Sequence, residues 1–402
     1  MLRRRRSIFI GIPILFLAST ALLFAVGYKP FVGARESYIF GVIGNDNTHL
    51  YEERQAGVEA KLFYLSWREF YPQEGVKDTA YIAAKKEELR QLREAGYKVI
   101  LELSYQDAPP WVHQNYANSY YIDQYGEPYT ATAPFDNGDT NLVFNHELRG
   151  LAATYLYDAI SEFGTNFYAV RLGGGRYGEL TYPPTNWNGK TNRYWAYDQN
   201  AQASSPVPGW TPGSPSPNGE AAKFLDWYLD SLVDYQNWQI SALRATGYNG
   251  KIMMLYPSWG IRPGQIEEAV ATNLNGTTSA EMNGEIQRGY DFARQVRAIE
   301  DPKVVLTTTW LEANFDTVAD RQYNPRYWSP VHYLASLAET HPLDLDLYGE
   351  NGGEDDREAM EVSASRMRRY GLLGMCWYNE SELFSGQYAS LSDYEQTIES
   401  SQ

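Results

Sequence analysis

The sequence predicts an α/β protein in which strands and helices alternate to form one eight-stranded parallel barrel. Two observations predict the barrel: eight apolar or aromatic runs of strand length recur along the chain, and helical patterns separate several of them. A third observation, an apolar segment that follows four arginines near the N-terminus, predicts a membrane helix before the barrel. A (β/α)8, or TIM, barrel needs about 250 residues. The chain has 402, so we expect a TIM barrel with long loop insertions, preceded by an N-terminal transmembrane helix.

The first thirty residues have the signals of a membrane anchor. Four arginines, Arg3 to Arg6, precede an uncharged, mostly apolar run of 19 residues from Ile8 to Val26, and a membrane-spanning helix needs about 20. Because positive residues stay in the cytoplasm, we expect residues 1–30 to be a cytoplasmic basic stub and a membrane anchor. Residues 31–402 would then be an extracytoplasmic domain held at the cell membrane. A cleaved signal peptide, and hence secretion, is the alternative, although no good cleavage site follows Val26.

The composition argues against several kinds of partner and cofactor. The formal net charge is −16, and it becomes −21 when the five basic residues within 1–30 are set aside, so the chain would repel nucleic-acid phosphates. The five histidines are scattered and Cys376 is the only cysteine, so we expect no metal site, no intramolecular disulfide and no other cofactor. The 33 tyrosines and 11 tryptophans stand out instead. Such rings either pack in a core or stack on a ligand.

The predicted elements follow one another in a regular order. The eight strand-like runs are Tyr38–Ile43, Lys61–Trp67, Lys98–Ser104, Phe167–Leu172, Lys251–Tyr256, Val304–Leu311, Leu343–Tyr348 and Leu372–Trp377. Helical patterns lie at Thr79–Ala95, His146–Phe163, Ala221–Thr246, Ala280–Ile299 and Asp355–Tyr370. Eight runs fit a barrel better than the competing doubly wound open sheet, which would show fewer. Residues 204–219 are too rich in Pro, Ser and Gly for a helix or strand, and we interpret them as a loop insertion within one barrel domain.

Three glutamates follow predicted strands, in the position where barrel enzymes build their active sites. Glu179 follows the fourth run, Glu312 the sixth and Glu350 the seventh. Their neighbours are glycines and aromatic residues rather than lysines, so burial can raise the pKa of these carboxyl groups. Carboxyl groups in different environments are what general acid and general base roles require. We therefore predict that these three glutamates are catalytic.

A glycine-rich motif after the fourth strand is rejected on mechanism. Gly173, Gly175 and Gly178 spell the dinucleotide fingerprint G-x-G-x-x-G, which needs a helix to begin at the third glycine. Pro183 and Pro184 follow too closely for that helix. We interpret the glycines as allowing the backbone to approach a ligand or the end of the barrel closely.

Aromatic residues gather near the ends of the predicted strands, which favours a sugar site. Sugar rings pack their C–H faces on aromatic planes, and their hydroxyl groups need Asn, Asp, Glu or Arg. The predicted substrate-binding residues of both kinds are Trp67, Tyr105, Trp111, Arg176, Tyr182, Trp259, Trp310, Asn351 and Trp377. Further polar loop residues that could contact hydroxyl groups are Asn137, Asp139, Asn141, Asn186, Asn314 and Asp316.

The three glutamate segments resemble motifs of the β-amylases, glycoside hydrolase family 14. VRLGGGRYGELTYPP, residues 170–184, is similar to the family's motif around its acid glutamate, and Tyr197-Asp198 resembles a pair that follows it. VVLTTTWLEA, residues 304–313, looks like the strand that carries the family's base, and YGEN, residues 348–351, looks like its later Gly-Glu-Asn. The resemblance implies an inverting glycosidase with Glu179 as acid and Glu312 as base, while Glu350 lines the sugar site.

Two features leave the sugar and the catalytic pair open. Where β-amylases have the residues that grip the glucose chain, this sequence has Tyr64, Gln106, Met253, Ser258 and Tyr378. The resemblance therefore implies a glycosidase without naming starch as its substrate. The chain also resembles barrel glycosidases of the β-galactosidase type, which have an acid/base after strand four and a nucleophile after strand seven. That second resemblance implies a retaining enzyme that uses Glu179 and Glu350.

Together these observations predict a glycoside hydrolase that cleaves O-glycosidic bonds of an oligo- or polysaccharide outside the cytoplasm. Its partners would be the carbohydrate substrate and, through the N-terminal helix, the membrane. The alternative from another class is a non-catalytic glycan-binding envelope protein on the same barrel. Loss of Glu179 separates the two, because only the enzyme needs its proton for turnover.

Overall fold

Eight parallel strands close into a barrel in the computed structural model, which describes residues 37–44, 47–130, 139–313, 319–353 and 355–402. The strands are paired in chain order, and β8 pairs with β1. They are β1 (Ile39–Ile43), β2 (Ala60–Ser66), β3 (Lys98–Ser104), β4 (Ala169–Leu172), β5 (Lys251–Tyr256), β6 (Val304–Thr308), β7 (Asp346–Glu350) and β8 (Gly374–Tyr378). Each strand overlaps one of the eight predicted runs, so the predicted TIM barrel is confirmed.

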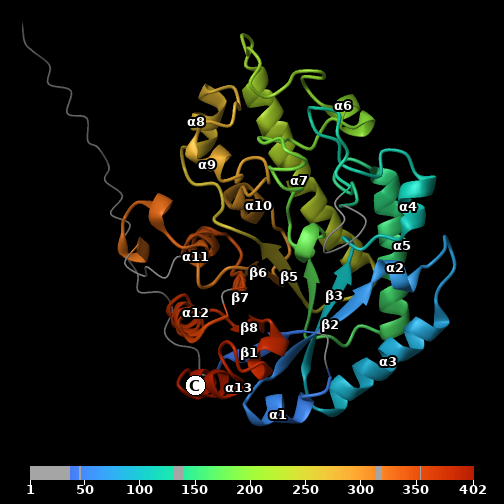
Figure 1. Cartoon of the computed structure of the whole chain (residues 1–402), viewed down its shortest axis with the longest axis vertical. Coiled ribbons are helices and arrows are strands. Elements are labelled where there is room, and N and C mark those ends of the chain that lie inside the picture. The colour runs from blue at the N-terminus through green and yellow to red at the C-terminus, as the bar shows by residue number, and fades with distance from the viewer. Residues whose placement is uncertain (1–36, 45–46, 131–138, 314–318, 354) are drawn as a thin grey trace, which may run out of the picture. The chain divides into compact units, whose positions relative to one another are not determined.

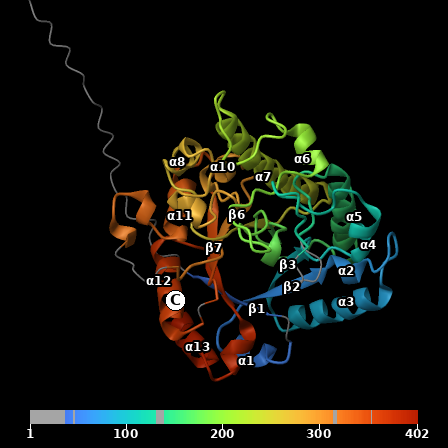
Figure 2. The same cartoon turned by 45° about the horizontal axis from the view of Figure 1, so that its top comes forward.

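Helices lie around the outside of the barrel, as Figure 1 and Figure 2 show from two directions. They are α1 (Leu50–Gln55), α2 (Trp67–Phe70), α3 (Thr79–Glu94), α4 (Pro110–Asn115), α5 (His146–Phe163), α6 (Gln199–Ser204), α7 (Glu220–Ala245), α8 (Gln265–Ala271), α9 (Ser279–Met282), α10 (Phe292–Arg297), α11 (Pro330–Thr340), α12 (Arg357–Arg369) and α13 (Leu391–Glu399). Side chains cap several of them, as Asp78 does for α3 and Asn145 for α5. Four of the five predicted helices, matching α3, α5, α7 and α12, are confirmed to within two residues at each end.

The fifth predicted helix, Ala280–Ile299, is wrong. This segment contains two short helices, α9 and α10, with a non-helical stretch between them. In that stretch Gly284 and Gly289 have φ of +83° and +76°, in the left-handed region that favours glycine. A Cβ at Gly289 would lie 2.8 Å from Leu232 of α7. The glycines therefore end the helix and let the chain pass close to α7.

The barrel interior changes from apolar to charged along the strands. Side chains of a strand point alternately to its two faces. The apolar cluster in the interior consists of Ala60, Leu62, Ile100, Ala169, Met253, Leu255, Val305, Tyr348 and Cys376. Glu102 on β3, Arg171 on β4 and Glu350 on β7 each follow a member of this cluster by two residues and are at most 8% exposed. The carboxyl end of the barrel is therefore its charged end.

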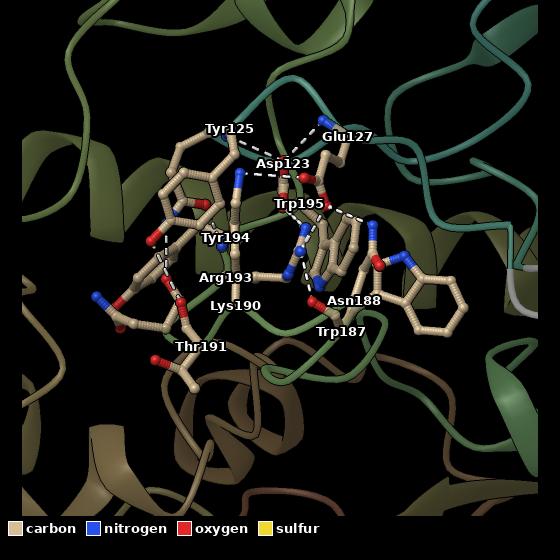
Figure 3. A network of polar contacts seen from close by, with 12 residues as sticks. Asp123, Tyr125, Glu127, Trp187, Asn188, Lys190, Thr191, Arg193, Tyr194 and Trp195 are labelled. Atoms are coloured by element: carbon tan, nitrogen blue, oxygen red, sulfur yellow. Dashed lines mark hydrogen bonds and ion pairs between the residues drawn. The ribbon is translucent and has the colours of Figure 1, made fainter.

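A buried ion-pair network joins the long loops that follow β3 and β4 (Figure 3). Arg193, after β4, and Asp123, after β3, are both fully buried and form an ion pair. Arg193 Nη2 also lies 2.6 Å from Glu127 Oε2, and its guanidinium is 5.6 Å from the centre of the Trp195 ring. Removing one partner of a buried pair costs about 3–5 kcal/mol, because a charge is left without a counterion. The network thus fixes the two loops to each other.

The predicted insertion packs on the start of α7. Ser204, its first residue, ends α6, and residues 205–219 contain neither a helix nor a strand. The Trp210 ring lies against Phe224 of α7, with ring centroids 5.6 Å apart. The backbone carbonyl of Trp210 accepts a hydrogen bond from the Tyr197 hydroxyl at 3.0 Å. These contacts hold the Pro- and Ser-rich segment against the helix that follows it.

The predicted membrane segment, Ile8–Val26, lies outside the described residues. Within the part of the chain that the structure describes, no helix combines the length and the apolar character needed to cross a bilayer. The membrane anchor and the location outside the cytoplasm therefore stay predictions.

Candidate active site

Arg171 joins two glutamates inside the carboxyl end of the barrel. Its Nε lies 3.3 Å from Glu102 Oε2, and its Nη2 lies 3.1 Å from Glu350 Oε1. Glu102 is the direct neighbour of Arg171 in the register of β3 with β4, and Gln106 Nε2 donates to Glu102 Oε1 at 3.3 Å. One buried cation therefore faces two buried carboxyl groups, contributed by three strands.

The glycines after β4 let the chain fold back and present Glu179. A Cβ at Gly173 would lie 2.2 Å from the carbonyl oxygen of Gly178. Gly178 itself has φ of +82°, and a Cβ there would lie 2.8 Å from Glu102 Oε1. A 3-10 turn spans Arg176–Gly178 and Glu179 is extended, so no α-helix begins at the third glycine. The close backbone approach agrees with the sequence interpretation, and the helix that a dinucleotide site needs is not formed here.

Glu179 has a neutral hydrogen-bond partner. The Thr309 hydroxyl, from the loop after β6, donates to Glu179 Oε1 at 2.8 Å. Burial raises the pKa of Glu179, while the Thr309 hydrogen bond and the charges of Arg288 and Arg171 oppose the shift without cancelling it. A carboxyl group with a raised pKa holds its proton closer to neutral pH, as a general acid must.

Glu350 differs from Glu179 because its nearest partner, Arg171, is a cation. Burial raises the pKa of Glu350 to about 7, Arg171 opposes the rise, and the charges of Glu102, Glu179 and Glu312 add to it. Contact with Arg171 favours the ionised form of Glu350.

Glu312 lies under the loop that follows β7. It is 1% exposed, and the Gly352 backbone N–H donates to its Oε1 at 2.7 Å. A Cβ at Gly352 would lie 2.5 Å from Trp310 Cδ1, so the loop packs tightly over residues 310–312. Arg366 on α12 donates from Nη1 to the backbone carbonyl oxygens of Leu311 and Ala313, each at 2.7 Å. Glu312 is therefore placed between the end of β7 and α12.

Trp259 and Trp310 form an aromatic pair after β5 and β6. Both rings are partly exposed, with centroids 5.7 Å apart and planes at 68°. Glu285 fixes the Trp259 loop, because it accepts hydrogen bonds from Ser258 Oγ at 2.6 Å and from the Gly260 N–H at 2.8 Å. Partly exposed rings next to carboxyl groups offer a surface on which a sugar can stack.

Four predicted substrate-binding aromatics lie in the packing between the barrel and its helices. Trp67 and Tyr182 stack on tyrosines of α5 and α7, with ring centroids 5.7 and 4.0 Å apart. Tyr105 is 1% exposed and Trp377 is fully buried. Because Cys376 belongs to the interior cluster, its neighbour Trp377 points out of the barrel. The structure does not bring these four rings to the glutamates.

The other predicted binding residues are held by local contacts. Trp111, on α4, is partly exposed and donates its indole N–H to a backbone carbonyl at 2.8 Å. Asn351 is 2% exposed, and its Oδ1 accepts from the Tyr378 backbone N–H at 2.6 Å, which links the ends of β7 and β8. Arg176 is partly exposed and donates to the Tyr129 hydroxyl. Of the additional hydroxyl contacts, Asn137, Asn314 and Asp316 lie outside the described residues.

Sequence reasoning missed three charged residues of this site. Glu102 and Arg171 each interrupt an apolar strand near its carboxyl end, in KVILELS and YAVRL. A charge at an inward-facing position of such a strand is the signal that could have found them. Arg288 was hidden by the helix wrongly predicted over residues 280–299. Among the described residues, no three His, Cys, Asp or Glu side chains are grouped as a metal-ligand set.

The fold and this site define a TIM barrel with unlike carboxyl groups at the carboxyl ends of its strands. The catalytic domain of β-amylase from Paenibacillus polymyxa is similar over 92% of this chain and 100% of that chain, with a TM-score of 0.69 and 16% identity. The β-galactosidases of Marinomonas ef1 and Halorubrum lacusprofundi have TM-scores of 0.55 and 0.54 at 11% identity. The chain spans 54% and 58% of those two proteins. No family model and no curated protein matches the sequence, so the likeness shows a shared barrel fold.

Proposed function

We propose that the chain is a glycoside hydrolase that cleaves an oligo- or polysaccharide by inversion, with Glu179 as general acid and Glu350 as general base. The observation that carries this proposal is the contrast between the two groups. Glu179 accepts a hydrogen bond from the neutral Thr309, whereas Glu350 contacts the cationic Arg171. Hydrolysis of a glycosidic bond needs such a pair, one carboxyl group protonated and the other ionised.

Each residue has a defined task in the proposed reaction. Glu179 donates its proton to the glycosidic oxygen as the bond from that oxygen to the anomeric carbon breaks. Glu350 accepts a proton from the water that attacks the anomeric carbon from the opposite face, so the new hemiacetal has the inverted configuration. Arg171 favours the ionised form of Glu350, whose pKa of about 7 leaves it partly ionised near neutral pH. Trp259 and Trp310 supply the aromatic surface on which a sugar ring lies.

The contacts support Glu350 rather than Glu312 as the partner of Glu179, although the sequence favoured Glu312. Glu350 projects into the barrel and shares the influence of Arg171 with Glu179. Glu312 lies beneath the β7 loop and next to α12. A general base also works best when its pKa lies near the operating pH, and the pKa of Glu350 is about 7.

The structural neighbours support the class of reaction. A β-amylase and two β-galactosidases are all named for glycosidase activity, and they have the same barrel. The chain matches the whole β-amylase catalytic domain but only part of each β-galactosidase. We further propose that the barrel is outside the cytoplasm and anchored by residues 8–26. Protease treatment of intact cells checks this, since a protected barrel would contradict it.

A substrate screen with proton NMR tests the proposal. Aryl glycosides and bacterial polysaccharides are incubated with the protein, and NMR identifies the first anomer released. Inversion is the expected result. Net retention, together with a glycosyl azide formed by Glu350→Gly in the presence of azide, would instead make Glu350 a nucleophile. Sugar binding without any turnover would overturn the enzyme and favour the glycan-binding alternative.

A further inference from the structure

Two arginines lie beside Glu179 without taking part in the proposed proton transfers. Arg176 precedes Glu179 by three residues, and Arg288 donates from Nε to the hydroxyl of Thr181 at 3.0 Å. Burial raises the pKa of Asp139 to about 6, and the charges of Arg288 and Arg176 oppose that rise. Arg288 acts in the same way on the pKa of Glu179. Because Arg176 and Thr181 both belong to the segment that follows β4, the Arg288–Thr181 hydrogen bond brings both arginines to the end of this strand.

Neither guanidinium has a carboxylate within ion-pair distance among the residues that the structure describes. The partner of Arg176 is the Tyr129 hydroxyl, and that of Arg288 is the Thr181 hydroxyl. Arg171, in contrast, contacts two carboxyl groups. Arg176 and Arg288 are both only partly exposed, so an anion that contacted them would meet guanidinium groups already partly removed from water.

Arg176 is held in place by a prearranged aromatic support. Its guanidinium lies 6.0 Å from the centre of the Tyr129 ring and 5.7 Å from that of Tyr177. The Tyr129 ring meets those of Trp187 and Trp195 edge to face, at 5.0 and 5.3 Å. The ion-pair network of Figure 3, which contains both tryptophans, fixes this support. The arginine is thus positioned before any ligand arrives.

Positive charges beside Glu179 hinder its proposed proton donation unless a bound anion offsets them. A positive charge near a general acid lowers its pKa and so favours loss of the proton it must donate. An anionic group on the substrate would offset the charge of these two cations and remove this disadvantage.

We infer that Arg176 and Arg288 bind a negatively charged group, a carboxylate or a sulfate, on the sugar unit next to the scissile bond. The inference rests on the proposed glycosidase function and names its substrate class, an acidic glycan. Guanidinium groups form charge-assisted, often paired hydrogen bonds with the oxygens of such anions.

Matched substrates separate charge from shape. The carboxylate set compares polygalacturonate with its methyl ester, and 4-nitrophenyl glucuronides with the corresponding glucosides. The sulfate set compares a sulfated galactan with its desulfated form. We expect kcat/KM to be about tenfold or more higher for the charged member of at least one pair. The two sets distinguish a carboxylate from a sulfate. Equal or faster hydrolysis of every uncharged member would overturn the inference and leave the proposed function standing.

Arginine variants test whether these residues create the preference. Arg176→Gln and Arg288→Gln should each remove most of the discrimination between charged and uncharged substrates, and Arg288→Lys should retain part of it. Arg90→Gln is the matched control, since Arg90 is exposed on α3 and pairs with glutamates of the same helix. An equal loss on charged and uncharged substrates would assign the arginines a structural role and contradict the inference.

Binding measurements keep the two proposals distinguishable. Calorimetry on Glu179→Gln, titrated with oligogalacturonates and sulfated galactan oligosaccharides, measures recognition without turnover. Binding of one acidic series that is weakened about tenfold or more by Arg288→Gln supports the acidic-glycan site, even if the unsubstituted protein hydrolyses nothing. Binding that is unaffected by both arginine substitutions, or no binding of either series, contradicts it.

Discussion

The two halves of the barrel interior have different roles, although the same strands build both. On β3, Ile100 belongs to the apolar cluster, and Glu102, the next inward-facing residue, contacts Arg171. On β7, Tyr348 and Glu350 are related in the same way. Because side chains on one face of a strand recur every second residue, one inward step separates a packing position from a charged one. Substitutions at the two positions should therefore have separable effects on stability and on activity.

The largest effect is expected at Glu179, in the charged half. Glutamine cannot donate the proton, so Glu179→Gln should lower kcat/KM by about 10²–10⁴-fold on substrates with poor leaving groups. Activated aryl glycosides need little protonation of the leaving oxygen and should lose much less. Kinetics on two aryl glycosides that differ only in leaving-group pKa measure the difference. An equal loss on both would remove Glu179 from the acid role.

The second effect compares Glu350 with Glu312. Glu350→Gln removes the proposed base and should lower kcat by about 10²–10⁴-fold whatever the leaving group. Glu312→Gln alters a residue that the β7 loop covers, and we expect a much smaller loss. Steady-state kinetics of both variants, with urea unfolding to check the fold, measure this contrast. The opposite order would restore the pair that the sequence favoured.

Strands and long helices could be predicted from the sequence because their signals are local. The run Lys251–Tyr256 and the pattern His146–Phe163 coincide with β5 and α5, since apolar periodicity and strand length are read directly from the chain. The helix over residues 280–299 failed for a local reason as well. Gly284 and Gly289 adopt left-handed φ angles there, and glycines inside a helical pattern are a signal against an unbroken helix.

The candidate site was only partly predictable, because it depends on which face of each strand a side chain occupies. Glu179 and Glu350 could be found from their position after strands. Trp377 ends a strand-like run, but it points outward and packs near Tyr394 of α13. Contacts between distant strands, such as that of Arg171 with Glu350, have no signal in a single sequence.

The apolar half should affect stability instead of chemistry. Ile100→Ala removes buried methyl and methylene groups from the interior cluster and should lower the free energy of unfolding by about 2–5 kcal/mol, because Ile100 is 1% exposed. Urea denaturation measures this change. For the protein that remains folded, we expect kcat within about threefold of the unsubstituted value. A large loss of kcat in folded Ile100→Ala would break the proposed separation between the two halves.

The smallest expected effect is a shift in pH dependence. Glu350 must be ionised to act as a base and its pKa is about 7, so kcat/KM should fall about tenfold per pH unit once the pH is well below that value. The charge of Glu102 helps to raise the pKa of Glu350. Glu102→Gln removes that negative charge, and among the described residues Glu350 then becomes the only carboxylate that contacts Arg171. Both changes favour the ionised form of Glu350.

The acidic limb of the pH–rate profile of Glu102→Gln should therefore move to lower pH, by about one unit or less. Glu312→Gln is the matched comparison. The charge of Glu312 also raises the pKa of Glu350, but by less than the charge of Glu102 does. It should move the limb in the same direction by a smaller amount. A limb that moves to higher pH, or that stays fixed in both variants while activity persists, would mean that Glu350 is not the group whose ionisation controls the reaction.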